Sequence, residues 1–231
     1  MQFLIIILIL CLIIFLFGLH VLAKEDLVFV RKNITLEILF NLAFFAFGIG
    51  LFSSRLIYVL LHPSPGFLNP LVFFLFPYFP GLSLIGGVGG AVVFVLLYKR
   101  RKFPTDRIFD FFAMAFLGAL PFGFFGVQML LGMSDLFVGV VMPIIFFLTL
   151  FFFVKVLLPL NSRGEIRDGS LGFLFLLIFS FTLFLARIVH EKNDLQVLIQ
   201  IDTLLLLVLF ITSLIVLIMK EKGLSLPKRT S

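Results

Sequence analysis

The sequence has little charge, one cysteine and no tryptophan. Asp, Glu, Lys and Arg make up 13% of its 231 residues, whereas 62% are hydrophobic. A soluble core could not absorb so much apolar side chain, so this composition excludes an ordinary soluble domain. Because Cys11 is the only thiol, one chain can form neither a disulfide framework nor a cysteine-based metal site. We expect no metal and no cofactor.

The motifs of common soluble enzymes are also missing. There is no His-Glu-x-x-His pair for zinc and no Gly-x-Ser-x-Gly nucleophile elbow. The glycine-rich stretch 86–90 follows no predicted strand and has no lysine at P-loop spacing, which excludes a nucleotide-binding loop. Function must therefore be sought in the apolar part of the chain.

Apolar runs of about 20 residues dominate what is present, and such a run can cross a hydrocarbon core of ~30 Å as a helix. Breaking the chain at charged, proline and glycine clusters predicts seven transmembrane helices, near 3–22, 34–61, 81–98, 108–131, 136–158, 171–190 and 196–219. Prolines interrupt the apolar stretch 67–79, which predicts a short re-entrant or interfacial hairpin. We expect residues 1–231 to form a single all-α polytopic membrane domain.

Basic residues are distributed unevenly between the two sets of loops. Of the 18 Lys and Arg residues, 15 fall in alternate loops or the tail, and the other three are Arg55, Arg187 and Lys192. The positive-inside rule then predicts an outside N-terminus and a cytoplasmic C-terminus. The net charge of +6 is expected to face anionic lipid headgroups rather than nucleic acid.

Several small or polar residues predict local structure. Asn33 and Thr105 stand just before apolar runs, where their side chains can cap a helix N-terminus. Asp110 lies in the first turn of the fourth predicted span, and we expect it to stabilise the start of that helix. Gly86 and Gly90, at Gly-xxx-Gly spacing, predict close packing between helices.

Three charged residues lie in the outer halves of predicted spans. Arg55 and Asp202 are roughly 9 Å below the outer ends of their helices and Arg187 roughly 5 Å, at 1.5 Å per residue. Such residues cost about 3 kcal/mol each at a helix centre, so they usually face a partner or a wet cavity. The one surplus positive charge suits a phosphate group. With Tyr58 and Gln128 of the same outer half, they predict a lipid-headgroup site; a structural ion pair or snorkelling explains the charges equally well.

Four short stretches follow one another in an order that resembles a known family. They are Ser54-Arg55-Leu56-Ile57-Tyr58, Asn69-Pro70-Leu71, Gly81-Leu82-Ser83-Leu84-Ile85-Gly86-Gly87 and, after the basic loop 99–102, Asp110-Phe111. In this order they resemble the bacterial prolipoprotein diacylglyceryl transferases over roughly residues 24–219. The resemblance implies transfer of diacylglyceryl from phosphatidylglycerol, an anionic phospholipid, to the lipobox cysteine of a preprotein. It also implies a multi-pass protein of the bacterial cytoplasmic (inner) membrane.

The chain departs from the family pattern at the positions of the working residues. The motif histidine is replaced by Ile85, the Arg and Asn of Gly-Arg-x-Gly-Asn by Phe124 and Val127, His-Pro by Met142-Pro143, and the late Arg-x-x-x-Glu by Leu183 and Arg187. Neither Ile nor Phe can move a proton or hold a phosphate, so we expect little or no ordinary transferase activity and assign no catalytic residue.

Three functions remain open on the sequence. The first is a divergent transferase that acts on phosphatidylglycerol and a lipobox preprotein. The second is a non-catalytic relative that binds lipid or serves as a scaffold. The third is a small membrane transporter, because a polar pocket in the outer half of a helical bundle also suits transport.

Overall fold

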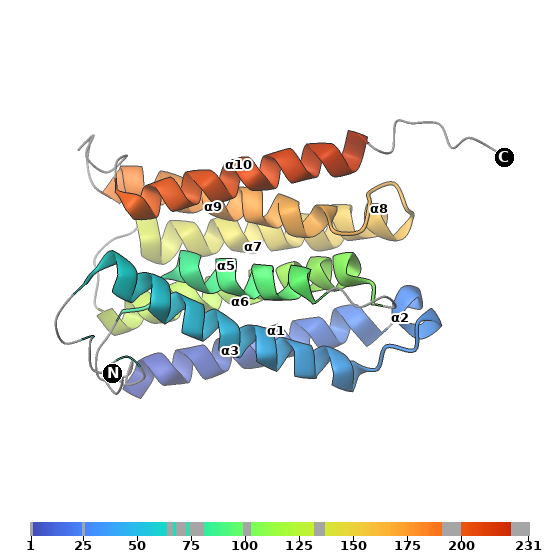
Figure 1. Ribbon diagram of the computed structural model, residues 1–231, viewed down its shortest axis with the longest axis horizontal. Coiled ribbons are helices and arrows are strands. Elements are labelled where there is room, and N and C mark those ends of the chain that lie inside the picture. The colour runs from blue at the N-terminus through green and yellow to red at the C-terminus, as the bar shows by residue number, and fades with distance from the viewer. Residues whose placement is uncertain are drawn as a thin grey trace.

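The computed structural model describes residues 2–24, 26–63, 67, 73, 81–98, 103–131, 137–190 and 200–222. Every regular element in these ranges is helical. The longer helices lie roughly side by side (Figure 1). In chain order, the α-helices are α1 (Gln2–Lys24), α2 (Leu27–Arg31), α3 (Leu36–Leu61), α5 (Leu84–Leu97), α6 (Thr105–Leu131), α7 (Met142–Phe152), α8 (Leu158–Ser162), α9 (Ser170–His190) and α10 (Ile201–Lys222).

Six stretches are long and apolar enough to cross a membrane, so the chain is a multi-pass membrane protein. They are Ile5–Lys24, Leu36–Leu61, Thr105–Met129, Gly139–Ser162, Ser170–Val189 and Ile201–Lys222. The prediction of an all-α membrane fold is thus confirmed for the described residues. The segment predicted near 81–98 forms α5, whose 14 residues extend about 21 Å, short of a ~30 Å core. The predicted hairpin near 67–79 lies outside the described residues, apart from Phe67 and Phe73.

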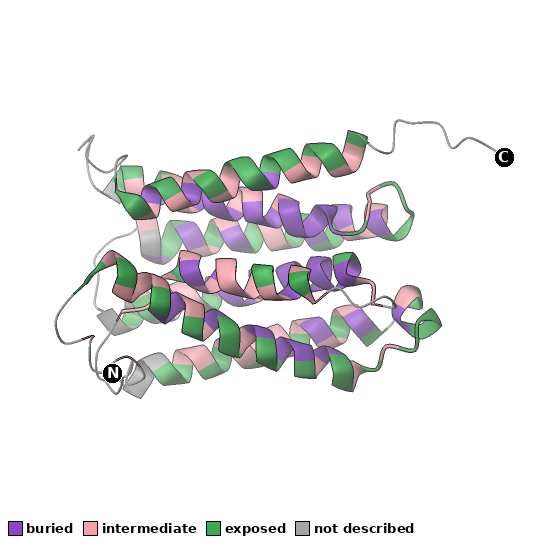
Figure 2. Cartoon of the chain, in the orientation of Figure 1, coloured by how far each residue is buried: buried purple, intermediate pink, exposed green. Residues whose placement is uncertain are grey.

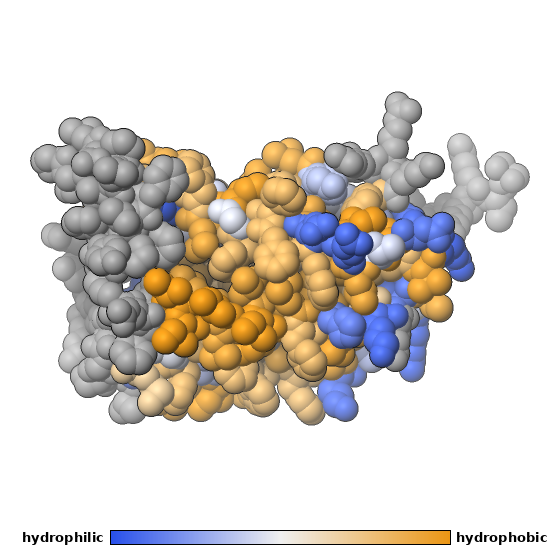
Figure 3. All heavy atoms as spheres, turned by 90° about the horizontal axis from the view of Figure 1, so that it is seen from below, coloured by the Kyte–Doolittle hydropathy of each residue, from blue (hydrophilic) through white to orange (hydrophobic). Residues whose placement is uncertain are grey.

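The helix bundle has two ends of different character. At the basic end, α1, α5 and α10 finish, α6 and α9 begin, and short helices α2 and α8 lie beside them (Figure 1). At the opposite end, α3, α6 and α9 finish and α5, α7 and α10 begin. We call this the cavity end, because the cavity described in the next subsection lies there. Apolar side chains cover much of the face in Figure 3, and hydrophilic ones gather toward the basic end. The middle of the bundle therefore has the surface expected in contact with lipid chains.

Helix α6 is the centre of the bundle. In its most apolar stretch 67% of the residues are buried, against 6% in α1 (Figure 2). Helix α1 packs on α6 through small residues: a Cβ built on Gly18 would lie 3.4 Å from the Cα of Ala115. Phe146 and Phe179, from the neighbouring helices α7 and α9, are fully buried in the core.

Helices α3 and α5 pack closely through glycine, as the glycine spacing predicts. A Cβ added to Gly86 would lie 2.7 Å from the Cβ of Ile57, and one added to Gly87 would lie 3.3 Å from the Cβ of Ser54. By contrast, a Cβ at Gly89 would meet nothing within 4 Å. Close packing of this kind replaces the hydrophobic effect as the force that joins helices in lipid.

A network of ionised side chains joins the helices at the basic end. The Arg107 guanidinium donates to the Asp26 carboxylate at 2.9 Å and to Asp168 at 2.9 Å, and also to the Asn161 side-chain oxygen. The Arg107 and Asp26 side chains are only 8% and 5% exposed. Lys220 of α10 forms a further 2.9 Å ion pair with Asp106. These contacts connect α2, α6, α8, α10 and the loop before α9.

Asp110 stabilises the start of a neighbouring helix. Its two carboxylate oxygens accept from the backbone N–H groups of Gly169 and Gly172, at 2.6 and 2.7 Å, where α9 begins. A carboxylate is favourable there because the first N–H groups of a helix have no partner within the helix. The sequence-based prediction placed this role at the start of α6, so the helix it named is corrected.

Other helix ends also differ from the predictions. Asn33 does not cap α3; it has a φ of +53°, and the side chain of Thr35 accepts from the N–H of Ile38 instead. Thr105 is the first residue of α6. The stretch predicted near 136–158 is helical but changes to π-helical turns at Phe137–Val141 and Phe153–Leu157. Such turns are rare and usually short.

Candidate functional site

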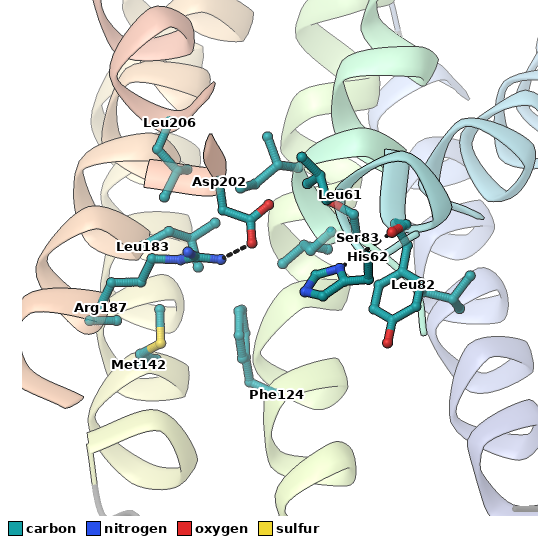
Figure 4. A pocket seen from close by; sticks show the side chains of 14 residues that line it. Leu61, His62, Leu82, Ser83, Phe124, Met142, Leu183, Arg187, Asp202 and Leu206 are labelled. Carbon is teal, nitrogen blue, oxygen red and sulfur yellow. Dashed lines mark hydrogen bonds and ion pairs between the residues drawn. The ribbon is translucent and has the colours of Figure 1, made fainter. Parts of the chain in front are cut away.

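A cavity of about 330 Å³ lies at the cavity end of the bundle (Figure 4). Residues of α3, α5, α6, α7, α9 and α10, and of the segments that flank α3 and α5, line it. They are Tyr58, Leu61, His62, Leu82, Ser83, Leu84, Ile85, Phe124, Met142, Leu183, Ala186, Arg187, Asp202 and Leu206. Most of this wall is apolar, and the few polar groups come from α3, α9, α10 and the start of α5.

An ion pair forms the most polar part of the wall. The Arg187 guanidinium donates to the Asp202 carboxylate at 2.9 Å, and the two side chains are 29% and 22% exposed. Figure 4 shows them pointing toward each other from α9 and α10, with Phe124 and Met142 nearby. The pair carries no net charge, yet it offers the cavity both hydrogen-bond donors and an acceptor.

Tyr58 and His62 form a stacked pair on the opposite wall. Their ring centroids are 4.7 Å apart with 22° between the planes, as expected for side chains four residues apart near the end of α3. The phenol and the imidazole can each donate and accept a hydrogen bond. His62 and Ser83 lie across the cavity from Arg187 and Asp202 in Figure 4.

Helix α5 begins at the cavity because Ser83 caps it. The Ser83 hydroxyl accepts from the N–H of Gly86 at 3.2 Å. Its backbone is joined to Ser54 of α3 twice: the Ser83 N–H donates to the Ser54 carbonyl, and the Ser54 hydroxyl donates to the Ser83 carbonyl. Leu84 and Ile85 then place the first turn of α5 in the cavity wall.

Arg55, predicted to bind a headgroup, is not part of the cavity wall. It is 2% exposed and donates to two backbone carbonyls, from Nε to Phe73 at 3.1 Å and from Nη1 to Gly81 at 2.7 Å. Its guanidinium carbon also lies 5.0 Å from the Phe67 ring centroid and 5.8 Å from that of Tyr58. These distances are within the range of cation–π contacts.

The structure brings three of the five predicted site residues onto one cavity: Tyr58, Arg187 and Asp202. Gln128 lies one turn beyond Phe124 on α6, and its side chain instead packs where a Cβ on Gly139 would be. Sequence reasoning did not assign Ser83 to the site. Ser83 stands just before an apolar, glycine-rich run, and a serine in such a place often caps a helix N-terminus. The cavity therefore has the chemistry to hold an amphiphile with a small polar head.

Comparison with protein-family models, curated proteins and solved structures finds no match for this chain.

Proposed function

We propose that this protein is a divergent, largely non-catalytic relative of the prolipoprotein diacylglyceryl transferases that holds a phospholipid headgroup in the cavity. Its ligand is phosphatidylglycerol, whose phosphate accepts from Arg187 while the acyl chains extend into the bilayer. From the family resemblance we propose a second partner, a preprotein that carries a lipobox. The membrane is the cytoplasmic membrane of a bacterium.

The convergence of five motif positions carries this proposal. The motif comparison pairs scattered positions with the family's working residues. Val127, which replaces the motif asparagine, does not line the cavity, but five of the other positions do: Ile85, Phe124, Met142, Leu183 and Arg187. They come from four different helices and span about 100 residues of sequence. A chance alignment of short motifs would scatter these positions over the bundle, so their meeting supports the resemblance.

The cavity also suits the head of a phospholipid. Its volume is at the lower end of the usual range for small-molecule sites. An apolar wall with one guanidinium matches glycerol carbons joined to a phosphate, and guanidinium binds phosphate oxygens well. Because the ion pair lies within candidate spans, a headgroup there would still be continuous with lipid chains outside the bundle.

The same wall argues against ordinary transfer chemistry. Ile85, Phe124 and Leu183 offer no acid, base or anion-binding group, although the family pattern has His and Arg there. Losing one oxyanion-type contact typically lowers a rate by ~10²–10³, and losing several leaves only residual catalysis. Binding without efficient transfer is the function that these side chains support.

We further propose seven crossings with the N-terminus outside. Helix α3 ends at the cavity end and α6 begins at the basic end, so the chain must cross between them, and α5 makes that crossing. The positive-inside rule places the basic end in the cytoplasm. In a Cys11→Ser background, Pro63→Cys should label from outside intact cells and Arg163→Cys should not; the reverse pattern would contradict this orientation.

Lipid retention tests the proposed binding. The full chain is purified in detergent, exposed to equal amounts of phosphatidylglycerol and phosphatidylethanolamine, and scored by native mass spectrometry. We expect phosphatidylglycerol to be retained, and Arg187→Gln to lower its retention about tenfold. Arg163→Gln removes an exposed charge of the basic end and serves as the matched control. Equal retention by wild type and Arg187→Gln would exclude the cavity as the headgroup site.

A further inference from the structure

Arg55 lies behind the cavity wall, and two of its hydrogen bonds are to the backbone between α3 and α5. The acceptors of these two bonds are the carbonyls of Phe73 and Gly81. Guanidinium carries its donors in a rigid planar fork, so two carbonyls held by one Arg are fixed relative to each other. A buried side chain used in this way defines the path of the backbone.

Gly81, whose carbonyl accepts from Arg55, lies three residues before the first residue of α5. Its φ is +144°, which side-chain-bearing residues rarely adopt, and a Cβ built there would collide with the Tyr58 ring. Two residues later, Ser83 caps α5 and is joined to Ser54, the neighbour of Arg55. Arg55 and Ser54 therefore hold the same short segment from both of its ends.

Arg55 also contacts an aromatic residue of the cavity wall that lies across from Arg187 and Asp202. Its guanidinium lies near the faces of Phe67 and Tyr58, and Tyr58 stacks on His62. Tyr58 and His62 line the cavity, as do Ser83 and the first turn of α5. One buried guanidinium thus contacts both Tyr58, which stacks on His62, and the segment that sets the start of α5.

We propose that Arg55 is a positioning residue that preforms the α3–α5 wall of the cavity, and that Arg187 alone supplies the guanidinium for the ligand. The sequence-based prediction had both arginines share one phosphate. In this arrangement, Arg55 determines whether the cavity is formed, whereas Arg187 determines which headgroup it prefers. Only the second half of this statement rests on the proposed function.

Hydrogen exchange tests the positioning role without any ligand. The N–H groups of Gly86 and Gly87 donate to Ser83, so we expect them to be protected from exchange. In Arg55→Gln we expect peptides covering 83–87 to exchange at least tenfold faster, while peptides covering 109–117 of α6 keep wild-type rates. Arg55→Lys can still reach one carbonyl, so its exchange should be intermediate. Unchanged exchange at 83–87 would overturn the proposal.

Headgroup selectivity gives the second measurement, with the same two lipids. Arg55→Gln should lower retention of phosphatidylglycerol and phosphatidylethanolamine by the same factor, whereas Arg187→Gln should change their ratio. A changed ratio in Arg55→Gln with wild-type exchange would show that Arg55 binds the headgroup. If wild type retains neither lipid, the proposed function fails but the exchange experiment still decides the role of Arg55. If Arg55→Gln does not fold, Arg55→Lys and Gly81→Ala, which disturbs the same segment, are compared instead.

Discussion

The two ends of the bundle treat buried charge differently. At the basic end, Arg107 contacts Asp26, Asp168 and Asn161 together, and Asp26 has almost no exposure. At the cavity end, Arg187 has the single partner Asp202 among the contacts of the described side chains, and both are about a quarter exposed. The first arrangement leaves few donors for a ligand. In the second, the partly exposed Arg187 guanidinium forms part of the cavity wall.

This difference separates the residues that hold the bundle together from those that can bind. Removing one member of a buried ion pair such as Arg107–Asp26 leaves the other charged and unpaired, which is strongly destabilising. Removing one member of a partly exposed pair costs less, because water and nearby lipid headgroups can replace it. We therefore expect stability to be sensitive at the basic end and ligand binding to be sensitive at the cavity end.

The largest expected effect follows from Arg107→Ala. It leaves the buried Asp26 carboxylate without its guanidinium partner, and we expect a loss of about 3–5 kcal/mol in the free energy of unfolding. Thermal unfolding of purified protein, followed by monodispersity on size exclusion, measures it. Arg163→Ala at the same end is the control, because this side chain is exposed and should change stability by less than about 0.5 kcal/mol. Equal stability of the two variants would remove the distinction between the ends.

A smaller loss is expected between the ends, where α3 and α5 meet. Gly86→Ala would bring its Cβ to 2.7 Å from that of Ile57, so we expect a loss of about 1–3 kcal/mol from overpacking. Gly89→Ala is the matched control on the same helix, with open space around the added methyl. It should gain roughly 0.5–1 kcal/mol, because alanine favours a helix interior over glycine. The same thermal assay ranks the two, and a loss in both would contradict the packing described for α5.

The sequence predicts the helices well because apolar runs of sufficient length have few alternatives in a membrane. Six predicted spans agree with α1, α3, α5, α6, α9 and α10 to within about five residues at each end. The exact start of α5, three residues after that of the predicted span, could not be read from the sequence, because 81–98 is apolar almost throughout. Its start is fixed by the backbone at Gly81 and by the Ser83 cap, which depend on contacts with α3.

The candidate site is predictable only in part, for a related reason. Depth along the helices places Arg187 and Asp202 at a similar level, and the structure pairs them. The same depth argument adds Arg55, yet its acceptors are the backbone carbonyls of Phe73 and Gly81. Every residue carries a carbonyl, so a sequence gives no sign of which one a buried guanidinium will bind.

Asp202→Asn sharpens the comparison at the cavity end. It removes the carboxylate that competes with a phosphate for Arg187, while an amide can still accept from the guanidinium. We expect stability to change by less than about 1 kcal/mol and affinity for phosphatidylglycerol to rise about fivefold, which corresponds to roughly 1 kcal/mol. Lipid titration by native mass spectrometry measures the affinity. Weaker binding in this variant would mean that Asp202 itself contacts the ligand.

The smallest expected effect concerns chemistry. Wild-type protein incubated with phosphatidylglycerol and a lipobox peptide should add no more than a trace of diacylglyceryl to the peptide thiol, as scored by mass.

The combined variant Ile85→His and Phe124→Arg puts a base and a guanidinium back into the cavity wall, where both positions already lie. We expect a small gain, because Leu183 and Met142 would still lack the remaining polar groups and catalytic constellations are strongly non-additive. Phe124 also stacks on the buried Phe146 at 5.5 Å, so its replacement loosens the wall that must position the new groups. Ile85→Leu with Phe124→Leu is the matched control and should show no gain. Efficient transfer by the wild-type chain would contradict the proposal that binding is kept while the chemistry is lost, and it would direct attention to Tyr58, His62 and Arg187 as the reacting groups.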